Sequence, residues 1–514
     1  MRKLSVDQTL LLMALFAAVI MLLGTAWIGD DAFITLRVID NFVNGFGLRY
    51  NVIERVQAYT HPLWLFFLTP FYALTREPMV TTMLVSVALS MGALWLLATR
   101  IATRLVYGSV LILAAMMSRS IYQFSTSGLE SPLSFMLVAL FVWLLHGRPE
   151  KPWLAAACAG FLFLNRLDLA ILIGPALAAF WWEAGKRHRI RTGLAVVLPA
   201  LVWIVFSIIY YGAPFPNTAY AKLGTGFDAG TLIVRGLEYC REFVFSDPLL
   251  ALIMGKAIFD AFRSTRRTTR LLGVGIVLYC CYIISIGGDF MSGRFFAPPG
   301  FLAICLLAQN PVPQWLEKNL KPVFVGALVI LVILLATRLL EPPRFTIPDD
   351  GISDERRFYY TTTGLLPVLR KWAHTGSEPV PSWGVRGVEL RQEAQRTGKS
   401  IVAIEGNTGM FGYYAGPAIH NIDVLALSDA FLARLPAAPG SRTGHYMRIV
   451  TREYAESSLK PLPTIEIESL RPLLSDVTLA TRAPLFERGR WAAIWRLMSG
   501  QYSWVYHTDA LGMK

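Results

Sequence analysis

Long apolar runs alternate with short polar segments over the first two thirds of the chain, and this pattern predicts a bundle of membrane-spanning helices. Residues 9–28 are almost wholly apolar over about twenty positions, which is enough to cross a bilayer. The run lacks a small-residue cleavage site of the A-x-A kind, so we expect a retained anchor. Ten further runs occur near residues 79–98, 104–118, 129–146, 153–165, 169–182, 193–211, 246–262, 271–287, 296–309 and 322–340. We therefore predict an all-α polytopic membrane protein with about eleven transmembrane helices.

One more apolar segment is too short to count with these. Residues 62–75 read PLWLFFLTPFYALT, a run that fits a helix at the membrane interface better than a full crossing. We therefore do not count this segment as a crossing, and the predicted side of every later loop depends on that choice.

Basic residues then fall on alternate loops. With Met1-Arg2-Lys3 inside, one side of the membrane receives Arg100/Arg104, Arg148/Lys151, Lys186-Arg187 with Arg189/Arg191, Arg263/Arg266/Arg267/Arg270 and Lys318/Lys321. Cytoplasmic loops carry an excess of Lys and Arg, so we assign this side to the cytoplasm. Five polar motifs then lie outside, together with everything after about residue 341: GDDAF (29–33), TSGLES (126–131), NRLD (165–168), PFPNTAYAK (214–222) and GGDFMSGRFF (287–296). Such convergence of polar loops on one face is typical of an active site.

Composition supports the membrane class. The 514 residues are 54% hydrophobic and only 16% charged, and the mean hydropathy is +0.47. The net charge of +13 would suggest nucleic acid in a soluble protein, but here the loop topology accounts for the basic residues, and we expect no nucleic-acid partner. The five cysteines show neither metal-ligand spacing nor a disulfide framework, and no metal or other cofactor is expected.

The first external loop opens on two adjacent acids, Asp30 and Asp31. Apolar residues recur at helical spacing after them, which predicts an amphipathic helix along the membrane surface that ends at Gly45 and Gly47. One Asp can cap this helix, because Asp is a favoured N-cap residue. A cap does not explain two acids, and a carboxylate beside a hydrocarbon surface can act as a catalytic base.

Other polar residues of these motifs allow two interpretations each. His61, before a proline, either hydrogen-bonds the loop or takes part in chemistry, and Glu54 lies in the same loop. Glu130 either binds sugar hydroxyls or caps the helix that begins near Pro132.

The chain changes character after the last apolar run. The segment EPPRFTIPDD (341–350) marks a boundary, so we predict a membrane module over residues 1–340 and a soluble extracytoplasmic domain over 341–514. Residues 400–405 and 418–425 read as strands on either side of a glycine-rich turn with a short helix. The sequence therefore predicts a small α/β unit, whose glycine spacing fits no nucleotide-binding motif.

The motifs together resemble the GT-C membrane glycosyltransferases. The resemblance is strongest to the bacterial group related to the mycobacterial terminal β-arabinofuranosyltransferase, and it rests on GDDAFITLRVIDNFVNGFGLRYN…ERVQAYTHPLW, TSGLESPL, NRLD, PFPNTAYAK and GGDFMSGRFF. It implies transfer of a sugar, a pentofuranose such as arabinofuranose, from a polyprenyl-phosphate carrier to an extracytoplasmic glycan or protein. It also implies that the acid of the first loop, Asp30 or Asp31, acts in the chemistry. One motif departs from the family, because Asn165-Arg166-Leu167-Asp168 stands where an Arg-Pro-acid-Gly turn is usual.

A polyprenyl-phosphate leaving group needs cations at the membrane surface. Arg166, Lys222 and Arg294 are the external basic residues best placed in polar motifs, with Arg37 in addition. Asp168, Asn217 and Asp289 lie in the same motifs and complete the predicted donor-binding set. Two alternatives stay open: Arg166 could pair with Asp168, and Arg294 with Asp289.

Two rival functions also remain. A lipid-linked sugar transporter or flippase would favour inverted repeats and charges in mid-span, neither of which stands out here. A membrane scaffold for envelope assembly would leave the convergence of five polar loops unexplained.

Overall fold

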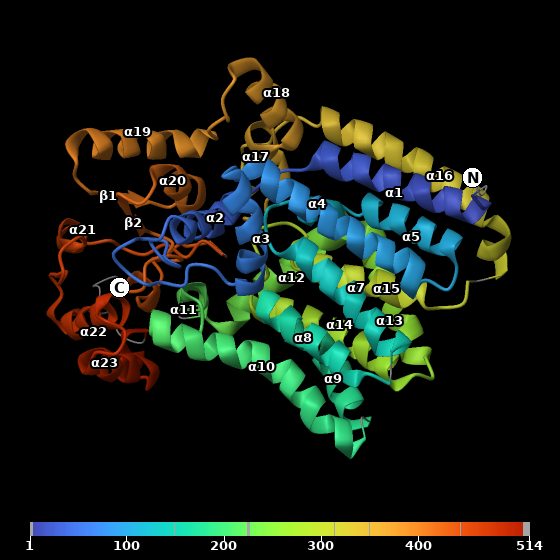
Figure 1. The fold of residues 1–514 in the computed structure, drawn as a ribbon, viewed down its shortest axis with the longest axis horizontal. Helices are drawn as coiled ribbons and strands as arrows, with labels where there is room; N and C mark the ends of the chain where they lie inside the picture. Colours follow the sequence, from blue (N-terminus) through green and yellow to red (C-terminus); the bar gives the residue numbers. More distant parts are fainter. Residues whose placement is uncertain are drawn as a thin grey trace. The chain divides into compact units, whose positions relative to one another are not determined.

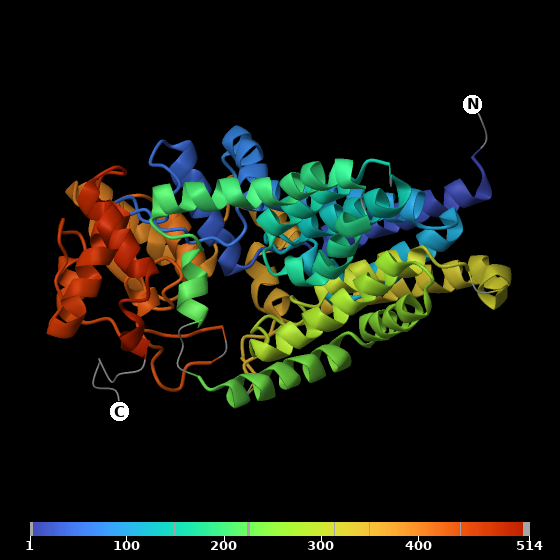
Figure 2. The ribbon, with the colours of Figure 1, turned by 90° about the horizontal axis from the view of Figure 1, so that it is seen from below.

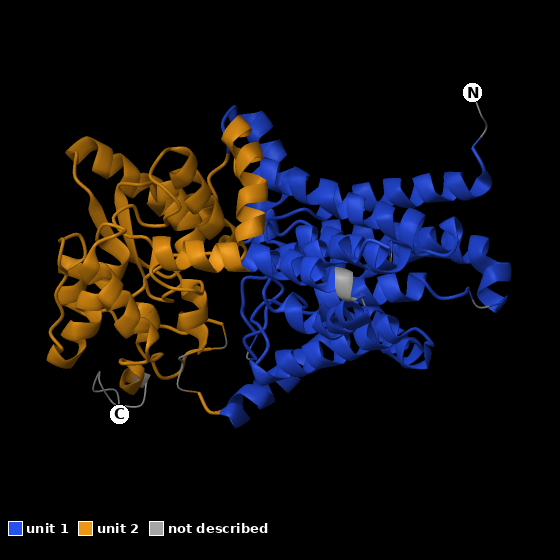
Figure 3. Ribbon diagram, turned by 60° about the horizontal axis from the view of Figure 1, so that its bottom comes forward, with its two compact units in different colours: residues 1–29, 79–200, 229–378 blue, residues 30–78, 201–228, 379–514 orange. Residues whose placement is uncertain are grey.

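The computed structural model describes residues 4–148, 150–183, 185–223, 227–312, 314–348, 350–442 and 444–506. The chain divides into two compact units, drawn in different colours in Figure 3. Unit 1 comprises residues 1–29, 79–200 and 229–378, and unit 2 comprises residues 30–78, 201–228 and 379–514. The predicted boundary near residue 341 concerns membrane topology and stays a prediction.

Unit 1 is built from helices, and every predicted apolar run is one of the helices of the chain. Their bounds are α1 (Val6–Thr25), α4 (Met79–Leu96), α5 (Leu105–Met117), α6 (Arg119–Phe124), α7 (Ser131–Gly147), α8 (Pro152–Asn165), α9 (Leu169–Glu183), α10 (Lys186–Tyr211, shared with unit 2), α12 (Ala229–Ser246), α13 (Pro248–Arg263), α14 (Arg267–Ser285), α15 (Ala297–Ala308), α16 (Gln314–Leu340), α17 (Glu355–Thr363) and α18 (Leu365–Thr375).

Among the described residues, five helices are long and apolar enough to cross a membrane. They are Val6–Thr25, Met79–Ile101, His188–Tyr211, Arg267–Ser285 and Gln314–Leu340. Shorter apolar helices accompany them, including α5, α7, α8, α9 and α15. The chain is therefore a multi-pass membrane protein, while the predicted number of eleven crossings stays a prediction.

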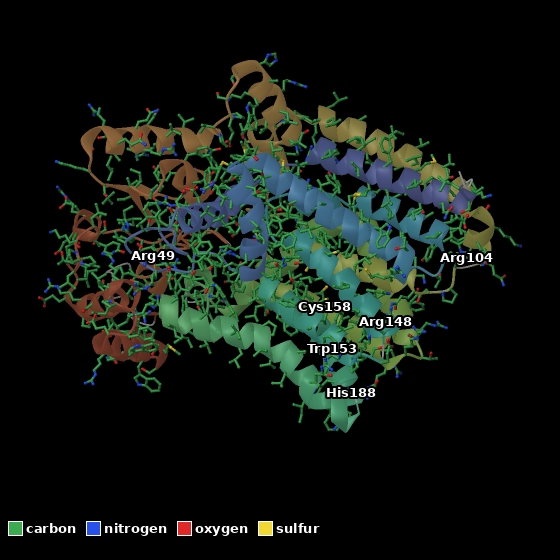
Figure 4. The ribbon with its side chains drawn as sticks, in the orientation of Figure 1. Arg49, Arg104, Arg148, Trp153, Cys158 and His188 are labelled. Carbon is green, nitrogen blue, oxygen red and sulfur yellow. The ribbon has the colours of Figure 1, made fainter. Side chains whose placement is uncertain are left out.

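The loops that we predicted to share the cytoplasmic side meet one another in unit 1. Arg104, before α5, pairs with Glu317 of α16 at 2.6 Å, and Arg267 of α14 pairs with Glu183 of α9 at 3.4 Å. Figure 4 labels Arg104 and also Arg148, the residue that follows α7. These contacts support the predicted grouping of the loops, and which side faces the cytoplasm stays a prediction. Residues Met1 to Lys3 lie outside the described residues, as do the side chains of Lys186 and Arg187.

Helix α12 was not predicted. It runs into α13 with a break at Asp247, whose carboxylate accepts hydrogen bonds from the backbone N–H of Leu250 and the hydroxyl of Ser118. Helix α14 packs against both α12 and α13, as the yellow-green helices of Figure 2 show. Gly236 permits this close approach, because a Cβ there would lie 2.3 Å from the carbonyl oxygen of Ile284.

Unit 2 contains a small parallel β-α-β unit near its centre. Strand β1 (Ile401–Glu405) pairs with β2 (Ile419–Asp423), in register from Ile401 opposite Ile419, and helix α20 (Thr408–Ala415) connects them. Figure 1 shows α19 (Ser382–Thr397) beside α20. The predicted strands, turn and short helix are confirmed. The other helices of unit 2 are α2 (Asp30–Val43), α3 (Pro62–Thr75), α11 (Asn217–Leu223), α21 (Arg452–Ser457), α22 (Arg471–Arg482) and α23 (Arg488–Met498).

Helix α2 is confirmed, while its predicted position along the membrane surface stays a prediction. Residues 32–39 are all buried, including Arg37, which is only 2% exposed. Phe33 packs edge-on against Tyr413 of α20, so the helix lies against the β-α-β unit. Of the polar residues of α2, Arg37 is buried by packing within unit 2, whereas Asp40 is partly exposed and Asn44, just after the helix, is exposed.

Candidate active site

Asp30 caps a helix, although not the helix that its sequence neighbours predicted. Its carboxylate oxygens accept the backbone N–H groups of Gly409 at 3.0 Å and Met410 at 2.7 Å, in the first turn of α20. The N-cap residue Asn407 makes no side-chain cap hydrogen bond. Asp30 therefore satisfies orphan donors of α20 from a distant point of the chain. Gly409 is required for this approach, since a Cβ there would lie 1.8 Å from the Asp30 carbonyl oxygen.

Burial raises the pKa of Asp30 to about 7, with a smaller contribution from the neighbouring Asp31. The two backbone hydrogen bonds oppose this rise, because they favour the ionised form. Asp31 lies in the first turn of α2 and is partly exposed. Asp30 has the same intermediate exposure, and what distinguishes it is its pair of hydrogen bonds to α20.

Arg37 holds the first loop to the β-α-β unit. Its guanidinium donates to the backbone carbonyls of Tyr50 at 2.8 Å, Gly412 at 2.7 Å and Ile419 at 2.7 Å. The same group stacks over the Tyr50 ring at 4.2 Å. Carbonyls thus occupy donors on all three nitrogens, and this placement favours a structural role over contact with a phosphate.

Glu54 joins a buried group of acids in unit 2. Its carboxylate accepts a hydrogen bond from Asn51 at 3.2 Å and pairs with Arg482 at 3.4 Å. Burial, followed by the charge of Glu54, raises the pKa of Asp429 to about 7. Burial likewise raises the pKa of Asp423, at the end of β2, to about 6, although three backbone N–H groups bind it. These acids organise the turn after β2.

Two further predicted residues of unit 2, Asn217 and His61, make hydrogen bonds within that unit. Asn217 donates through its amide to the carbonyls of Ala426 at 2.8 Å and Asp429 at 3.0 Å, which fixes the same turn. His61 shares a hydrogen bond of 2.8 Å with the hydroxyl of Thr35 on α2. Lys222 is partly exposed near the end of α11.

In unit 1 the structure brings together all five predicted site residues. Glu130, which is 1% exposed, lies 3.5 Å from Arg166 and 3.9 Å from Arg294. Arg166 forms a two-pronged pair with Asp168, at 2.6 and 3.1 Å. Arg294 lies 3.6 Å from Asp289. Residues from TSGLES, NRLD and GGDFMSGRFF thus form one ionic network, while the predicted convergence of all five motifs stays a prediction.

The network contains both ion pairs that the sequence left open, and whether these residues also bind the donor stays a prediction. The Arg166–Asp168 and Arg294–Asp289 pairs are both present, so the charges of the NRLD turn meet despite the missing proline. Glu130 occupies the N-cap position of α7, as the capping alternative predicted, but its side chain makes no cap hydrogen bond.

Tyr279 of α14 belongs to the same network but was missed by the sequence reasoning. Its hydroxyl bonds both Arg166, at 3.1 Å, and the carboxylate of Asp168. The residue lies in the apolar run LYCCYII. The only clue in the sequence was a tyrosine hydroxyl within a predicted membrane helix that ends near a polar loop. With two arginines and three carboxylates, the network carries one excess negative charge.

Comparison with known proteins identifies relatives of this chain. No protein-family model matches the chain. The terminal β-(1→2)-arabinofuranosyltransferase of Mycobacterium tuberculosis is 28% identical over 402 residues, which are 66% of this chain and 63% of that protein. Its namesake from Corynebacterium glutamicum is 28% identical over 509 residues, covering 82% of this chain and 72% of that protein. The chain is a distant homologue of these arabinofuranosyltransferases.

The resemblance that the motifs predicted is therefore confirmed, and both relatives are glycosyltransferases by name. The chain spans just under two thirds of the length of the first relative. Among solved structures, ArnT from Cupriavidus metallidurans in the apo state matches with a TM-score of 0.45 at 14% identity, over 83% of this chain and 76% of that one.

Proposed function

We propose that the chain is a GT-C glycosyltransferase that moves a pentofuranose, such as arabinofuranose, from a polyprenyl-phosphate carrier to an extracytoplasmic glycan or protein. The observation that carries this proposal is the homology to two terminal β-(1→2)-arabinofuranosyltransferases, one of which aligns with 82% of the chain. The membrane-spanning helices support a lipid-linked donor, because nucleotide sugars stay in the cytoplasm.

Asp31 is the acid that we assign to the chemistry. Both carboxylate oxygens of its neighbour Asp30 hold the first turn of α20, so Asp30 has a structural task that accounts for it. A positioned carboxylate that removes the proton of an acceptor hydroxyl contributes roughly 10²–10⁴-fold to the rate. On this proposal, Asp30 of GDDAF caps a helix and Asp31 acts as the base.

The ionic network of unit 1 is suited to the hydroxyl groups of the donor sugar. Its carboxylates outnumber its arginines, so it offers little net attraction to a phosphate. Glu130 and Asp289 can accept hydrogen bonds from sugar hydroxyls, while Arg294 can donate to a ring oxygen. Arg294 lies 3.6 Å from Asp289 and 3.9 Å from Glu130, so a sugar held by these carboxylates would also be within reach of its guanidinium.

A transfer assay tests the proposal. The purified protein, given labelled polyprenyl-phosphoryl-arabinofuranose and an arabinan acceptor, should move the label to the glycan. Asp31→Asn should reduce this transfer by about 10² or more. Asp40→Asn, the same exchange on the same helix, is the matched control and should leave the transfer near the wild-type rate. Label that reaches the opposite leaflet but never the glycan would instead identify a flippase.

A further inference from the structure

A second cluster of charged residues in unit 1 lies apart from the predicted motifs. It forms where the last turns of the candidate spans α1 and α16 meet α6 and α17. Arg356 of α17 donates to the carbonyl of Thr25, at the end of α1, at 3.1 Å. Arg338 lies in the last turn of α16, and Arg119 begins α6. The cluster therefore lies at the end of two helices that cross the membrane.

Two carboxylates hold the arginines in place. Glu341 pairs with Arg338 at 3.3 Å and Arg357 at 3.4 Å, and it lies 4.0 Å from Arg356. Asp354, which also caps α17, pairs with Arg119 at 2.9 Å. The arginines are thus fixed on a scaffold of helix ends.

Four buried donors of this cluster have no hydrogen-bond partner among the residues that the structure describes. They are Nε of Arg119, Nε of Arg338, Nη2 of Arg356 and the hydroxyl of Tyr122. Arg356 is 2% exposed and Tyr122 is 1% exposed. All three arginines act electrostatically on the Tyr122 hydroxyl, so the four donors belong to one neighbourhood. Buried donors left unpaired are costly, and four in one place indicate a ligand that accepts several hydrogen bonds.

The charge of the cluster indicates that this ligand is an anion. Four arginines (Arg119, Arg338, Arg356, Arg357) face three carboxylates (Glu341, Asp354 and Glu242, which lies near Arg119), and one positive charge remains. A water molecule can accept two hydrogen bonds but cannot balance a charge. A phosphate has enough oxygens for all four donors, and arginine suits its geometry.

We propose that this cluster binds the phosphate of a membrane lipid, with Arg119, Arg338, Arg356 and Tyr122 as its donors. A lipid is indicated because the site lies at the ends of α1 and α16, where a lipid head group would be at the depth of the last helical turn. On the proposed function, on which this identification of the lipid rests, the ligand is the polyprenyl-phosphate donor. A phospholipid head group presents the same chemistry.

The backbone connects this site to the ionic network of Glu130 and Arg294. Ser353, next to the capping Asp354, accepts a hydrogen bond from the N–H of Ser292 at 3.0 Å and donates its own N–H to Phe290 at 2.8 Å. The loop that carries Asp289 and Arg294 is therefore paired with the start of α17. This continuity fits a donor whose phosphate and sugar are held by neighbouring parts of unit 1.

Binding of labelled polyprenyl phosphate to the full-length protein in dodecyl maltoside micelles tests the inference. Tyr122→Phe removes only the unpaired hydroxyl and should weaken binding several-fold, while Arg338→Gln should weaken it about tenfold or more. Arg344→Gln is the matched control, since it removes the same charge from an exposed position close to the end of α16 and should not change the affinity. Arg356 anchors α1, so it is a poorer choice for substitution.

Competition separates the sources of the phosphate. If polyprenyl phosphate is the natural ligand, excess phosphatidylglycerol and inorganic phosphate should displace it poorly. Equal displacement by phosphatidylglycerol would assign the same site to a phospholipid head group. Wild-type affinity in both Tyr122→Phe and Arg338→Gln would overturn the inference, and the proposed function would be unaffected. Weakened binding in these variants, beside a wild-type protein that transfers no sugar, would refute the function and leave the site standing.

Discussion

Substituting the two acids of GDDAF separately should divide their effects between stability and transfer. In Asp30→Asn one side-chain oxygen can still accept a backbone N–H of α20, but the amide nitrogen faces the second N–H donor. One buried donor loses its acceptor, which costs about 1–3 kcal/mol. We therefore expect Asp30→Asn to unfold at a lower temperature and to keep most of its transfer activity while folded.

Asp31→Asn should show the opposite pattern. Asn is nearly as good as Asp near the start of a helix, so the stability of α2 should change by only a few tenths of a kcal/mol. Loss of the base should lower transfer by about 10² or more, equivalent to about 2.7 kcal/mol of activation free energy.

Two measurements on each purified variant decide between these expectations. Thermal unfolding followed by tryptophan fluorescence reports stability, and label transfer from polyprenyl-phosphoryl-arabinofuranose reports chemistry. A stable Asp30→Asn without activity, beside an active Asp31→Asn, would reverse the two assignments. Near-normal transfer by both variants would show that neither acid is the base.

Three further predictions follow from the structure. Burial raises the pKa of Asp30, Asp423 and Asp429 to about 7, 6 and 7. Between about pH 4 and pH 7 the folded state therefore holds protons that the unfolded state releases. The free energy of unfolding should fall as the pH rises through this range. Unfolding scans at several pH values should show a shallower fall for Asp30→Asn. A cysteine placed at Arg76 should react with an impermeant reagent from outside the cell, and labelling only from the cytoplasm would refute the eleven-span topology. Arg294→Gln should raise the KM for the donor about tenfold or more, and an unchanged KM in a steady-state assay would remove Arg294 from the donor site.

The apolar helices could be read from the sequence because each is a continuous apolar run, and five of them are long enough to cross a bilayer. Helix α12 could not be predicted in this way. Its sequence AGTLIVRGLEYCREFVFS mixes charged and apolar residues, so it carries no continuous apolar run. The β-α-β unit was readable because its strands are short apolar runs bounded by glycine-rich turns.

The site was only partly readable, because the decisive contacts join residues far apart in the chain. The sequence identified Asp30 and Asp31 as unusual, but the partner of Asp30 lies at Gly409 and Met410, which no local pattern connects to it. The cluster of Arg119, Arg338 and Arg356 was even harder to predict. Arg119 and Arg338 are single arginines next to apolar helices, and only the fold places them with Arg356.

The most direct test of the central claim is the lipid composition of cells that lack this protein. If the chain transfers a sugar from a polyprenyl-phosphate carrier, the unused donor should accumulate. Mass spectrometry of a lipid extract should then show a raised level of polyprenyl-phosphoryl-pentose, restored to normal by the wild-type gene and not by Asp31→Asn. An unchanged level of every polyprenyl-phosphate sugar would contradict the account.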